Sequence, residues 1–342
     1  MRKISVIIPC YNAASCIDRC MTSVVGQTMG MDALEIICID DASTDDTWSC
    51  LQRWEQIYPD HILLVRQEVN RRQGAARNLG LSISSAEWIA YVDADDWLEP
   101  DYLEQLYTSV VQTTCDVAVC GWRSDRSDSL VYFGQGLESQ KQYVTVDTKE
   151  LRKQILINKS LSIAAWGKLI RRDFLVDHGI YFPEGLTYED EYWMPLLHIY
   201  AVNLCFINKP LYHYFVNDSS VLHSENMDYL MDWLTVQSMK WADYHKRGIL
   251  QEFREEMEYD LLYSTVNLLG RIIYDHDRQS FSYFRLLGEF VRKCVPDYRM
   301  NRYMEKFSKG QHMFFNMLYS SPDRALFRYF VEKMRSSIKM TD

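Results

Sequence analysis

Apolar and polar positions form two kinds of pattern along the first 120 residues. Short apolar runs predict strands, and apolar residues that recur every three or four positions between them predict helices. We expect strands at 6–8, 34–39, 62–65, 88–92 and 117–120, and helices at 16–25, 75–83, 98–111 and after 43–46. Strands that alternate with helices in this way are typical of βαβ units and a mostly parallel sheet.

Residues at the ends of these segments predict where two of the helices begin and end. Gly26 follows the first helical stretch and is a typical helix stop. Ser43 or Thr44 can cap the second helix, and the acidic residues that follow them, Asp45 and Asp46, suit the positive end of a helix.

The pattern changes twice farther along the chain. Residues 122–146 are polar and are expected to form a hairpin or a loop at one edge of the sheet. Helical stretches follow at 151–157 and 187–201. From about residue 224 the chain shows long helical patterns rich in Tyr, Met and Leu, so we place a domain boundary there, within about ten residues.

The composition argues against several classes of protein. The 342 residues carry 37 Lys and Arg against 47 Asp and Glu, and this net charge of −10 opposes binding to the phosphate backbone of a nucleic acid. No apolar run approaches the roughly 20 residues of a membrane-spanning helix, and the N-terminus is expected to form the first strand and not a signal peptide. The charge is uneven: residues 1–100 have 8 basic and 15 acidic side chains, whereas residues 291–342 have 11 and 5.

The nine cysteines form an odd set, with no Cys-x-x-Cys pair and no Cys/His cluster at zinc spacing. Most of them lie in apolar runs, as Cys38 does, where a reduced thiol acts as a small hydrophobic group. We therefore expect free thiols and a reducing, cytoplasmic location.

Acidic residues follow two of the predicted strands. Asp40 and Asp41 come at the end of the second strand, and Asp93, Asp95 and Asp96 follow the fourth. Open parallel sheets bind ligands beyond the carboxyl ends of their strands, so we expect these carboxylates to meet at one edge. Their repulsion favours a bound cation, and their oxygen atoms suit Mg²⁺ or Mn²⁺, which often bridges protein to phosphate. The alternative is that the last two cap the next helix.

Seven motifs of this chain resemble those of the family-2 glycosyltransferases, in the order and at the spacing of that family. The first four are SVIIPCYNA from Ser5, IDDASTD from Ile39, QGAARNLG from Gln73 and YVDADD from Tyr91. The others, which resemble the acceptor half of the family, are WGKL from Trp166, FPEG from Phe182 and YEDEYW from Tyr188.

The resemblance covers residues 4 to about 224 and implies the GT-A fold, an α/β architecture with a Rossmann-like, mostly parallel sheet. It divides a domain at 1–224 into a donor half, 1–121, and an acceptor half, 122–224. Residues 225–342 are left as a helical C-terminal region.

The resemblance also implies which residues contact the base of a nucleotide-sugar donor. Pro9 and Tyr11 would pack against the base, and Asp41 would accept a hydrogen bond from uracil. These roles suit the residue types, because a ring packs on the flat face of a base and a carboxylate accepts from an imide N–H.

The rest of the donor is assigned to four other residues by the same resemblance. Asn70 and Arg77 would lie beside the nucleotide, and Asp93 would hold the ribose. Asp95 would bind a divalent metal, Mg²⁺ or Mn²⁺, on the diphosphate. Such a metal neutralises the diphosphate that must leave.

The acidic cluster at 188–191 contains the candidate catalytic residues, Glu189 and Asp190. In an inverting transfer, one carboxylate takes the proton from the acceptor hydroxyl while that oxygen attacks the anomeric carbon. The resemblance points to Asp190 for this role. The alternative for the cluster is a helix N-terminus that carries acidic residues for electrostatic reasons alone.

Four further residues near these motifs have two open explanations each. Lys168 could touch the diphosphate or the acceptor, or it could be a snorkelling lysine beside a strand tryptophan, Trp166. His213 and His223 could be metal ligands near the diphosphate, or satisfied histidines without a role in chemistry. In addition, Ala42 stands where the family commonly has glycine, which should stiffen that turn.

The leading hypothesis is therefore an inverting, metal-dependent transferase that moves a sugar from a nucleotide diphosphate, in the first place UDP, to a hydroxyl of a glycan or lipid-linked glycan. A phosphohydrolase would need its Asp-x-Asp pair after the first strand, and a nucleotidyltransferase would need a glycine-rich basic loop there. An inactive nucleotide-sugar or glycan binding module of the same fold is the non-enzymatic alternative.

The basic C-terminus is amphipathic, with apolar residues on one helical face of 326–338 and Lys and Arg around the rest. Two hypotheses are open for this segment. It could lie on an anionic membrane at the inner face of the cell, or it could pack on its own domain.

Overall fold

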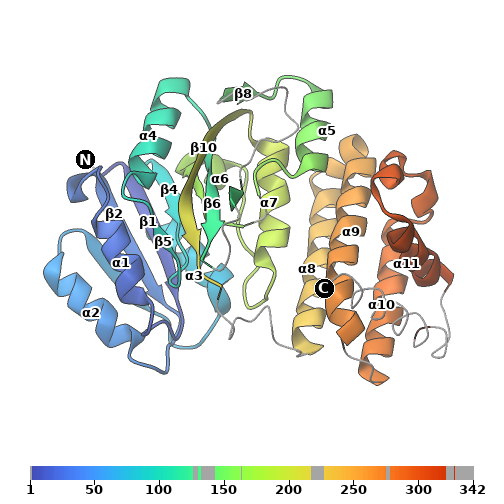
Figure 1. Ribbon diagram of the computed structural model, residues 1–342, viewed down its shortest axis with the longest axis horizontal. Coiled ribbons are helices and arrows are strands. Elements are labelled where there is room, and N and C mark those ends of the chain that lie inside the picture. The colour runs from blue at the N-terminus through green and yellow to red at the C-terminus, as the bar shows by residue number, and fades with distance from the viewer. Residues whose placement is uncertain are drawn as a thin grey trace. The chain divides into compact units, whose positions relative to one another are not determined.

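The structure is a computed structural model that describes residues 2–125, 130–131, 143–162, 164–216, 227–274, 278–320 and 327. The chain divides into two compact units, Met1–Ser220 and Val221–Asp342. In the first unit helices flank a sheet, and in the described part of the second unit all regular elements are helices (Figure 1).

The strands of the first unit form one sheet. They are β1 (Ile4–Cys10), β2 (Leu34–Asp40), β3 (Ile62–Arg66), β4 (Trp88–Tyr91), β5 (Trp97–Leu98), β6 (Val117–Ser124), β7 (Leu130–Val131), β8 (Tyr143–Thr145), β9 (Lys168–Arg171) and β10 (Asn203–Tyr214). Their order is β3-β2-β1-β4-β9-β6-β10-β5, with β7 beside β6 and β8 beside β10.

The sheet is mostly parallel, with β9 as an antiparallel strand in its middle. β1 pairs in parallel with β2 and β4, β2 with β3, and β6 with β10. β9 runs antiparallel to both of its neighbours, β4 and β6. The carboxyl ends of β1, β2, β4, β6 and β10 therefore lie at one edge, where β9 begins.

Seven helices are described in the first unit. They are α1 (Ile17–Val25), α2 (Thr47–Ile57), α3 (Arg72–Ile83), α4 (Tyr102–Thr113), α5 (Lys149–Asn158), α6 (Arg172–Asp177) and α7 (Glu189–Tyr200). Apolar residues of α1 and α4, such as Met21 and Leu106, pack with Ile8 in the main core on one face of the sheet. On the other face, α3 packs against β1 and β2, so β1 is buried on both sides.

Residues 92–96 connect β4 to β5 along the edge where the parallel strands end. β4 and β5 are not neighbours, because β9, β6 and β10 lie between them in the sheet. β5 pairs antiparallel with β10 through Leu98 and Tyr212. The predicted helix at 98–111 was wrong at its start, since residues 97–98 form this strand and α4 begins at Tyr102. The idea that Asp95 and Asp96 cap a helix was wrong for the same reason.

The predicted cap of α2 by Ser43 or Thr44 was also wrong. The residue before α2 is Asp46, and its side chain makes no capping hydrogen bond. The Ser43 hydroxyl accepts instead from the amide of Asn12 at 3.0 Å, and the Thr44 amide donates to the side chain of Asn12 at 2.8 Å. These groups join the loops after β1 and β2, so they are not available to the helix.

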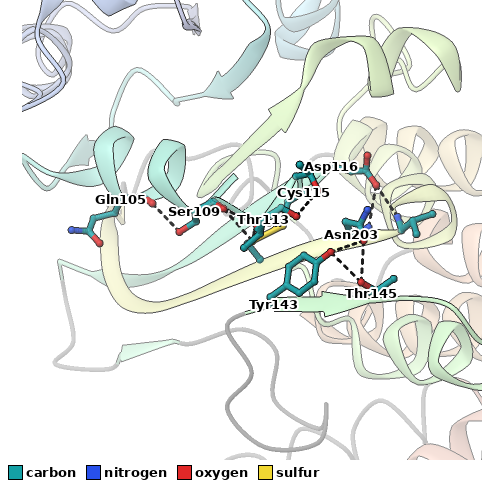
Figure 2. The surroundings of a disulfide bond; sticks show 11 residues. Gln105, Ser109, Thr113, Cys115, Asp116, Tyr143, Thr145 and Asn203 are labelled. Carbon is teal, nitrogen blue, oxygen red and sulfur yellow. Dashed lines mark hydrogen bonds between the residues drawn. A yellow bond between two sulfur atoms is a disulfide. The ribbon is translucent and has the colours of Figure 1, made fainter. Parts of the chain in front are cut away.

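The expectation that all cysteines are free was wrong for two of the nine. Cys115, just before β6, and Cys205, on β10, form a disulfide that Figure 2 shows. The parallel pairing of β6 and β10 brings these residues together across 90 positions of sequence, and no local pattern carries that information. The Thr113 hydroxyl contacts both sulfur atoms, at 3.0 Å and 2.8 Å.

The described helices of the second unit are α8 (Met227–Lys246), α9 (Ile249–Tyr274), α10 (Arg278–Cys294) and α11 (Lys309–Ser320). A buried ion pair joins the first two, because Lys240 Nζ lies 2.8 Å from Asp260 Oδ2. Among the described residues, no helix combines the length and the apolar character that crossing a bilayer requires. The predicted amphipathic helix at 326–338 lies outside the described residues except for Phe327.

Gly80 in α3 allows the close approach of this helix to β1. A β-carbon at position 80 would collide with Cγ2 of Ile7, a buried residue in the middle of the strand. We expect Gly80→Ala to lower the free energy of unfolding by about 1–3 kcal/mol, although alanine is the better helix former. Ser82→Ala, at an exposed position of the same helix, is the control and should change it by less than about 0.5 kcal/mol. Equal effects of the two substitutions in urea titrations would contradict this packing.

Candidate functional site

The predicted site residues gather at the edge where the parallel strands end. Pro9 is buried near the end of β1, and Tyr11 in the loop after β1 is 49% exposed. Asp41 follows β2, and Asp93 follows β4. Because these strands are parallel neighbours, the fold places at one edge the residues that the sequence places far apart.

Asp41 is buried, and the segment before α3 holds it. Its Oδ1 accepts from Gln67 Nε2 at 2.8 Å and from the amide of Arg71 at 2.7 Å. Burial raises the pKa of Asp41, while the hydrogen bond from the amide of Arg71 opposes that shift. Asn70 accepts a hydrogen bond from the amide of Arg72 at 3.0 Å, so its side chain shapes the beginning of α3.

Arg77 of α3 links the loop after β4 to the start of α7. Its guanidinium is 3% exposed, and Nη2 lies 2.7 Å from Asp93 Oδ1 while Nη1 lies 2.5 Å from Glu189 Oε1. Burial alone would lower the pKa of Arg77, but Asp93 and Glu189 raise it, so the cation is retained. The side chain thus joins the donor and acceptor motifs through one charged group.

The segment before α7 packs closely on α3. A β-carbon on Gly74 would collide with the carbonyl oxygen of Pro183 and would approach Glu189 Cγ to 3.3 Å. Asn78 accepts from the amide of Phe182 at 2.9 Å and donates to its carbonyl oxygen at 2.8 Å. The glycine and the asparagine of the third motif therefore keep the acidic cluster beside Arg77.

The two catalytic candidates have different surroundings. Glu189 is buried and receives hydrogen bonds from Arg77 and from Gln73 Nε2, the latter at 2.8 Å. Asp190 is half-buried, and its Oδ1 accepts from the amide of Glu191 at 2.9 Å. Burial, together with the charges of Glu189 and Glu191, raises the pKa of Asp190 well above its ordinary value. A raised pKa is what a general base that works near neutral pH requires.

The acidic residues in the loop after β4 also differ in their surroundings. Asp96 is buried, and its carboxylate accepts from the hydroxyl of Tyr212 at 2.6 Å and from the amide of Phe215 at 2.8 Å. Asp96 therefore anchors the loop to the end of β10. Asp95 is half-buried, and burial and the charge of Asp93 raise the pKa of Asp95 to about 6.

The surroundings of Asp95 suit a metal ion that is bound by the protein and by phosphate together. Within the described residues, no group of three or more His, Cys, Asp or Glu side chains is arranged to hold a metal ion. Mg²⁺ and Mn²⁺ often bind through one or two carboxylates with water and substrate phosphates as the remaining ligands. A carboxylate repelled by Asp93 would be stabilised by such a cation.

Lys168 lies at the first residue of β9, and the proposal of a snorkelling lysine was wrong. Its side chain is buried, and Nζ donates to the carbonyl oxygens of Ala164 at 2.6 Å and Trp166 at 3.2 Å. Burial lowers the pKa of Lys168 to about 7, and the charge of Asp190 opposes the shift. Trp166 is not in a strand but in the irregular segment before β9.

The structure describes one of the two histidines for which alternatives were open. His213 Nε2 donates to the carboxylate of Glu99 at 2.8 Å, and the ring stacks on Trp97, with centroids 4.8 Å apart. It is a satisfied side chain at the junction of β5 and β10. His223 lies outside the described residues.

Four residues of the site have a left-handed backbone, which side chains other than glycine rarely adopt. They are Asn12 (φ 48°), Ala42 (φ 58°), Arg72 (φ 64°) and Tyr188 (φ 63°). Each lies just before or within a segment that carries a predicted site residue. Such strain persists only where the surrounding structure fixes the backbone, and it is concentrated at functional sites.

Sequence reasoning missed Tyr212 and Arg19. The hydroxyl of Tyr212 accepts from the amide of Asp93 at 3.2 Å besides donating to Asp96. Arg19 donates to the carbonyl oxygen of Asp95 at 2.6 Å, and its guanidinium lies over the ring of Trp97. No signal in the sequence marks them, because an aromatic residue in a strand and an arginine on an exposed helix face are ordinary.

Comparisons with known proteins assign this arrangement to a family. The profile described as "Glycosyl transferase family 2" matches residues 5–179, about half of the chain. The chain belongs to glycosyltransferase family 2. It is 28% identical over 290 residues to EpsH of Bacillus subtilis, which is named as a glycosyltransferase, with 83% of this chain and 82% of EpsH covered.

TarS of Staphylococcus aureus, named poly(ribitol-phosphate) beta-N-acetylglucosaminyltransferase, is 24% identical over 308 residues, which span 87% of this chain and 50% of TarS. The crystal structure of TarS 1–349 with UDP-GlcNAc matches with a TM-score of 0.70 at 18% identity, over 98% of this chain and 92% of that one. The structure of a mannosyltransferase from Pyrobaculum calidifontis with GDP-Man and Mn²⁺ matches with a TM-score of 0.53 at 16% identity, over 96% and 88%.

These comparisons confirm the predicted fold class, GT-A with a helical C-terminal extension. They also confirm the predicted class of enzyme, so the chain is a glycosyltransferase. The roles of individual site residues stay predictions, as do the halves of the domain.

Tyr212 offers a test of how the acidic loop is held. Tyr212→Phe removes the donor to the buried carboxylate of Asp96, and we expect the free energy of unfolding to fall by about 1–3 kcal/mol. Tyr102→Phe is the control, because its hydroxyl is equally buried but makes one long hydrogen bond, 3.4 Å, to the carbonyl oxygen of Lys168. Tyr102→Phe should lower the free energy of unfolding clearly less, as measured by urea titrations. A decrease as large as that of Tyr212→Phe would contradict the anchoring role.

Proposed function

We propose that this glycosyltransferase acts by inversion, with a divalent cation, and moves a sugar from UDP to a hydroxyl of a glycan or lipid-linked glycan acceptor. The choice of UDP is supported by the TarS structures, which were solved with UDP-GlcNAc and with UDP. The use of a metal is supported by the Mn²⁺ in the mannosyltransferase structure and by the surroundings of Asp95.

The proposal rests mainly on the different surroundings of two neighbouring carboxylates, Glu189 and Asp190. Arg77 forms ion pairs with both Asp93 and Glu189, at 2.7 Å and 2.5 Å, and so brings the loop after β4 next to α7. Asp190 follows Glu189 directly, is not in that ion pair, and has a raised pKa. A carboxylate with a raised pKa thus stands next to the residues assigned to the donor.

The side chains have the following tasks in the proposed reaction. The exposed ring of Tyr11 packs on the base, and Asp41, already oriented by Gln67 and Arg71, accepts from it. Asp93, held by Arg77, binds the ribose. Asp190 takes the proton from the acceptor hydroxyl during its attack. We propose that Glu189 is a positioning residue, since its carboxylate is occupied by Arg77 and Gln73.

Asp95, with the phosphates of the donor, would hold the cation. A bound Mg²⁺ or Mn²⁺ would stabilise the negative charge that develops on the departing diphosphate. Arg19, which donates to the carbonyl oxygen of Asp95, fixes the backbone of this residue and leaves its carboxylate to the cation.

Replacing Asp95 tests the cation site and the donor together. Asp95→Asn removes a carboxylate that burial and Asp93 destabilise, so without metal we expect it to raise the free energy of unfolding at pH 7.5 by about 1–3 kcal/mol. Because the pKa in the folded state is raised, this gain should be absent below about pH 4 and complete only above about pH 6.

The ligand arm of this experiment measures melting temperatures with UDP-, GDP- and dTDP-sugars, with and without Mn²⁺. In the wild type, UDP-sugars should give the largest shift, and Mn²⁺ should enlarge it. In Asp95→Asn the Mn²⁺ effect should be lost. A metal effect that persists in the variant would place the cation elsewhere, and a larger shift with GDP- or dTDP-sugars would reject UDP.

Replacing Asp190 tests the base. We expect Asp190→Asn to slow the release of UDP from the preferred donor by a factor of about 10² to 10⁴ and to leave UDP affinity within about twofold. The base must be deprotonated, so kcat/KM of the wild type should increase with pH through the raised pKa of Asp190.

Glu191→Gln is the matched control for this carboxylate. It removes one of the charges that raise the pKa of Asp190, so the wild-type pH profile should move to lower pH while the maximal rate is retained. An Asp190→Asn variant with wild-type turnover would remove Asp190 from the role of base.

A further inference from the structure

Four aromatic rings form a cluster at the edge of the sheet that carries the site. Trp122 lies on β6, Trp166 precedes β9, and Tyr212 and Tyr214 lie on β10. Trp166 stacks on Tyr212 with centroids 4.4 Å apart and planes 5° apart, and on Tyr214 at 5.7 Å and 20°. Trp122 meets Trp166 and Tyr214 edge to face, at 5.6 Å and 5.8 Å.

The cluster has a fixed inner half and a half that reaches the surface. Tyr212 is fully buried and hydrogen-bonded to Asp96, and Trp166 is 9% exposed. Trp122 and Tyr214 are half-buried and pack against the main core. The rings beneath therefore hold these two outer rings in place, so a ligand that packs on them orders few further side chains.

The inner residues of the cluster are connected to both parts of the proposed reaction centre. Tyr212, beneath them, is bonded to the loop that carries Asp93 and Asp95. The carbonyl oxygen of Trp166 accepts from Lys168, whose ammonium is within electrostatic reach of Asp190. Burial raises the pKa of Tyr214, and the charges of Asp96 and Asp95 raise it further. The amide of the next residue, Phe215, donates to Asp96 at 2.8 Å, so this end of β10 lies beside the acidic loop.

We propose that Trp122 and Tyr214 form the stacking surface for a pyranose ring of the acceptor, and this inference rests on the proposed function. The C–H groups of one face of a pyranose are apolar and pack on aromatic rings, while its hydroxyls bond to carboxylates. An acceptor ring on this surface would have the acidic loop on one side and Asp190 on the other. TarS is named for poly(ribitol-phosphate), whose ribitol is an open chain and lacks such a face.

The charges around the rings also favour a neutral sugar over a polyol phosphate. Four negative charges raise the pKa of Tyr214, those of Asp96, Asp95, Asp93 and Asp125. Three basic side chains lie near the cluster, and each has partners. Lys168 donates to the carbonyl oxygens of Ala164 and Trp166, and Arg123 pairs with Glu99 at 3.8 Å. The guanidinium of Arg19 lies over the rings of Trp97 and Phe215. A phosphate at this surface would be repelled by these carboxylates, and each basic side chain named here already has a partner.

Binding of simple probes to the full chain tests the proposal. The probes are the methyl pyranosides of glucose, galactose and N-acetylglucosamine, with ribitol 5-phosphate as the open-chain comparison. Titrations followed by saturation-transfer NMR, with UDP and Mn²⁺ present, should show binding of at least one pyranoside and no comparable binding of ribitol 5-phosphate. Trp122→Ala and Tyr214→Ala should each weaken pyranoside binding by about tenfold, the share of one aromatic contact.

The controls separate failure of this proposal from failure of the proposed function. Trp54→Ala removes a half-buried tryptophan of α2, which packs on Tyr58, and should leave pyranoside binding unchanged. Trp122→Phe and Tyr214→Phe keep a ring and should stay within about threefold of the wild type. All variants should bind UDP as the wild type does, which also shows that they are folded. A wild type that does not bind UDP rejects the proposed function.

If UDP binds, three results would overturn the stacking surface alone. They are binding of none of the three pyranosides, tighter binding of ribitol 5-phosphate, or wild-type pyranoside affinity in Trp122→Ala and Tyr214→Ala.

Discussion

The site depends on one buried cation, the guanidinium of Arg77. It lies between Asp93 and Glu189, two carboxylates that come from motifs almost 100 residues apart in sequence. Removing one partner from a buried ion pair typically costs about 3–5 kcal/mol, because a charge is then left without compensation. Without Arg77 the acidic loop after β4 would repel the start of α7, and the donor and acceptor motifs could not share one site.

The main sheet holds the acidic side chains and the strained backbone of the site in place. Asn12, Ala42, Arg72 and Tyr188 adopt left-handed backbone conformations around the site, each of which is unfavourable for a residue with a side chain. They follow or precede elements with a large buried core, such as β1, in which all seven residues are buried. The rigid strands therefore stabilise loops that would not adopt these conformations alone, and the site side chains are held before a ligand arrives.

The loop between β4 and β5 connects strands that are not neighbours in the sheet. It passes along the edge of the sheet and is anchored to β10 through Asp96 and Tyr212. The ring of Tyr212 in turn stacks on Trp166, whose carbonyl oxygen accepts from the buried Lys168. The same side chains thus support the proposed donor residues and the proposed acceptor surface. A displacement of the acidic loop would therefore also move the acceptor surface.

The sequence by itself determined most strands and helices of the first 120 residues, the acidic residues at the strand ends and the family, because these depend on local periodicity and short motifs. Only the tertiary structure decided which of two adjacent acids, Glu189 and Asp190, is neutralised by Arg77. It also decided that Lys168 is buried, since β9 enters the sheet antiparallel and begins at the site edge. The Cys115–Cys205 bond likewise follows from the pairing of β6 with β10. Each of these outcomes is set by contacts between distant segments, and local patterns of hydrophobic and polar residues do not specify which distant segments meet.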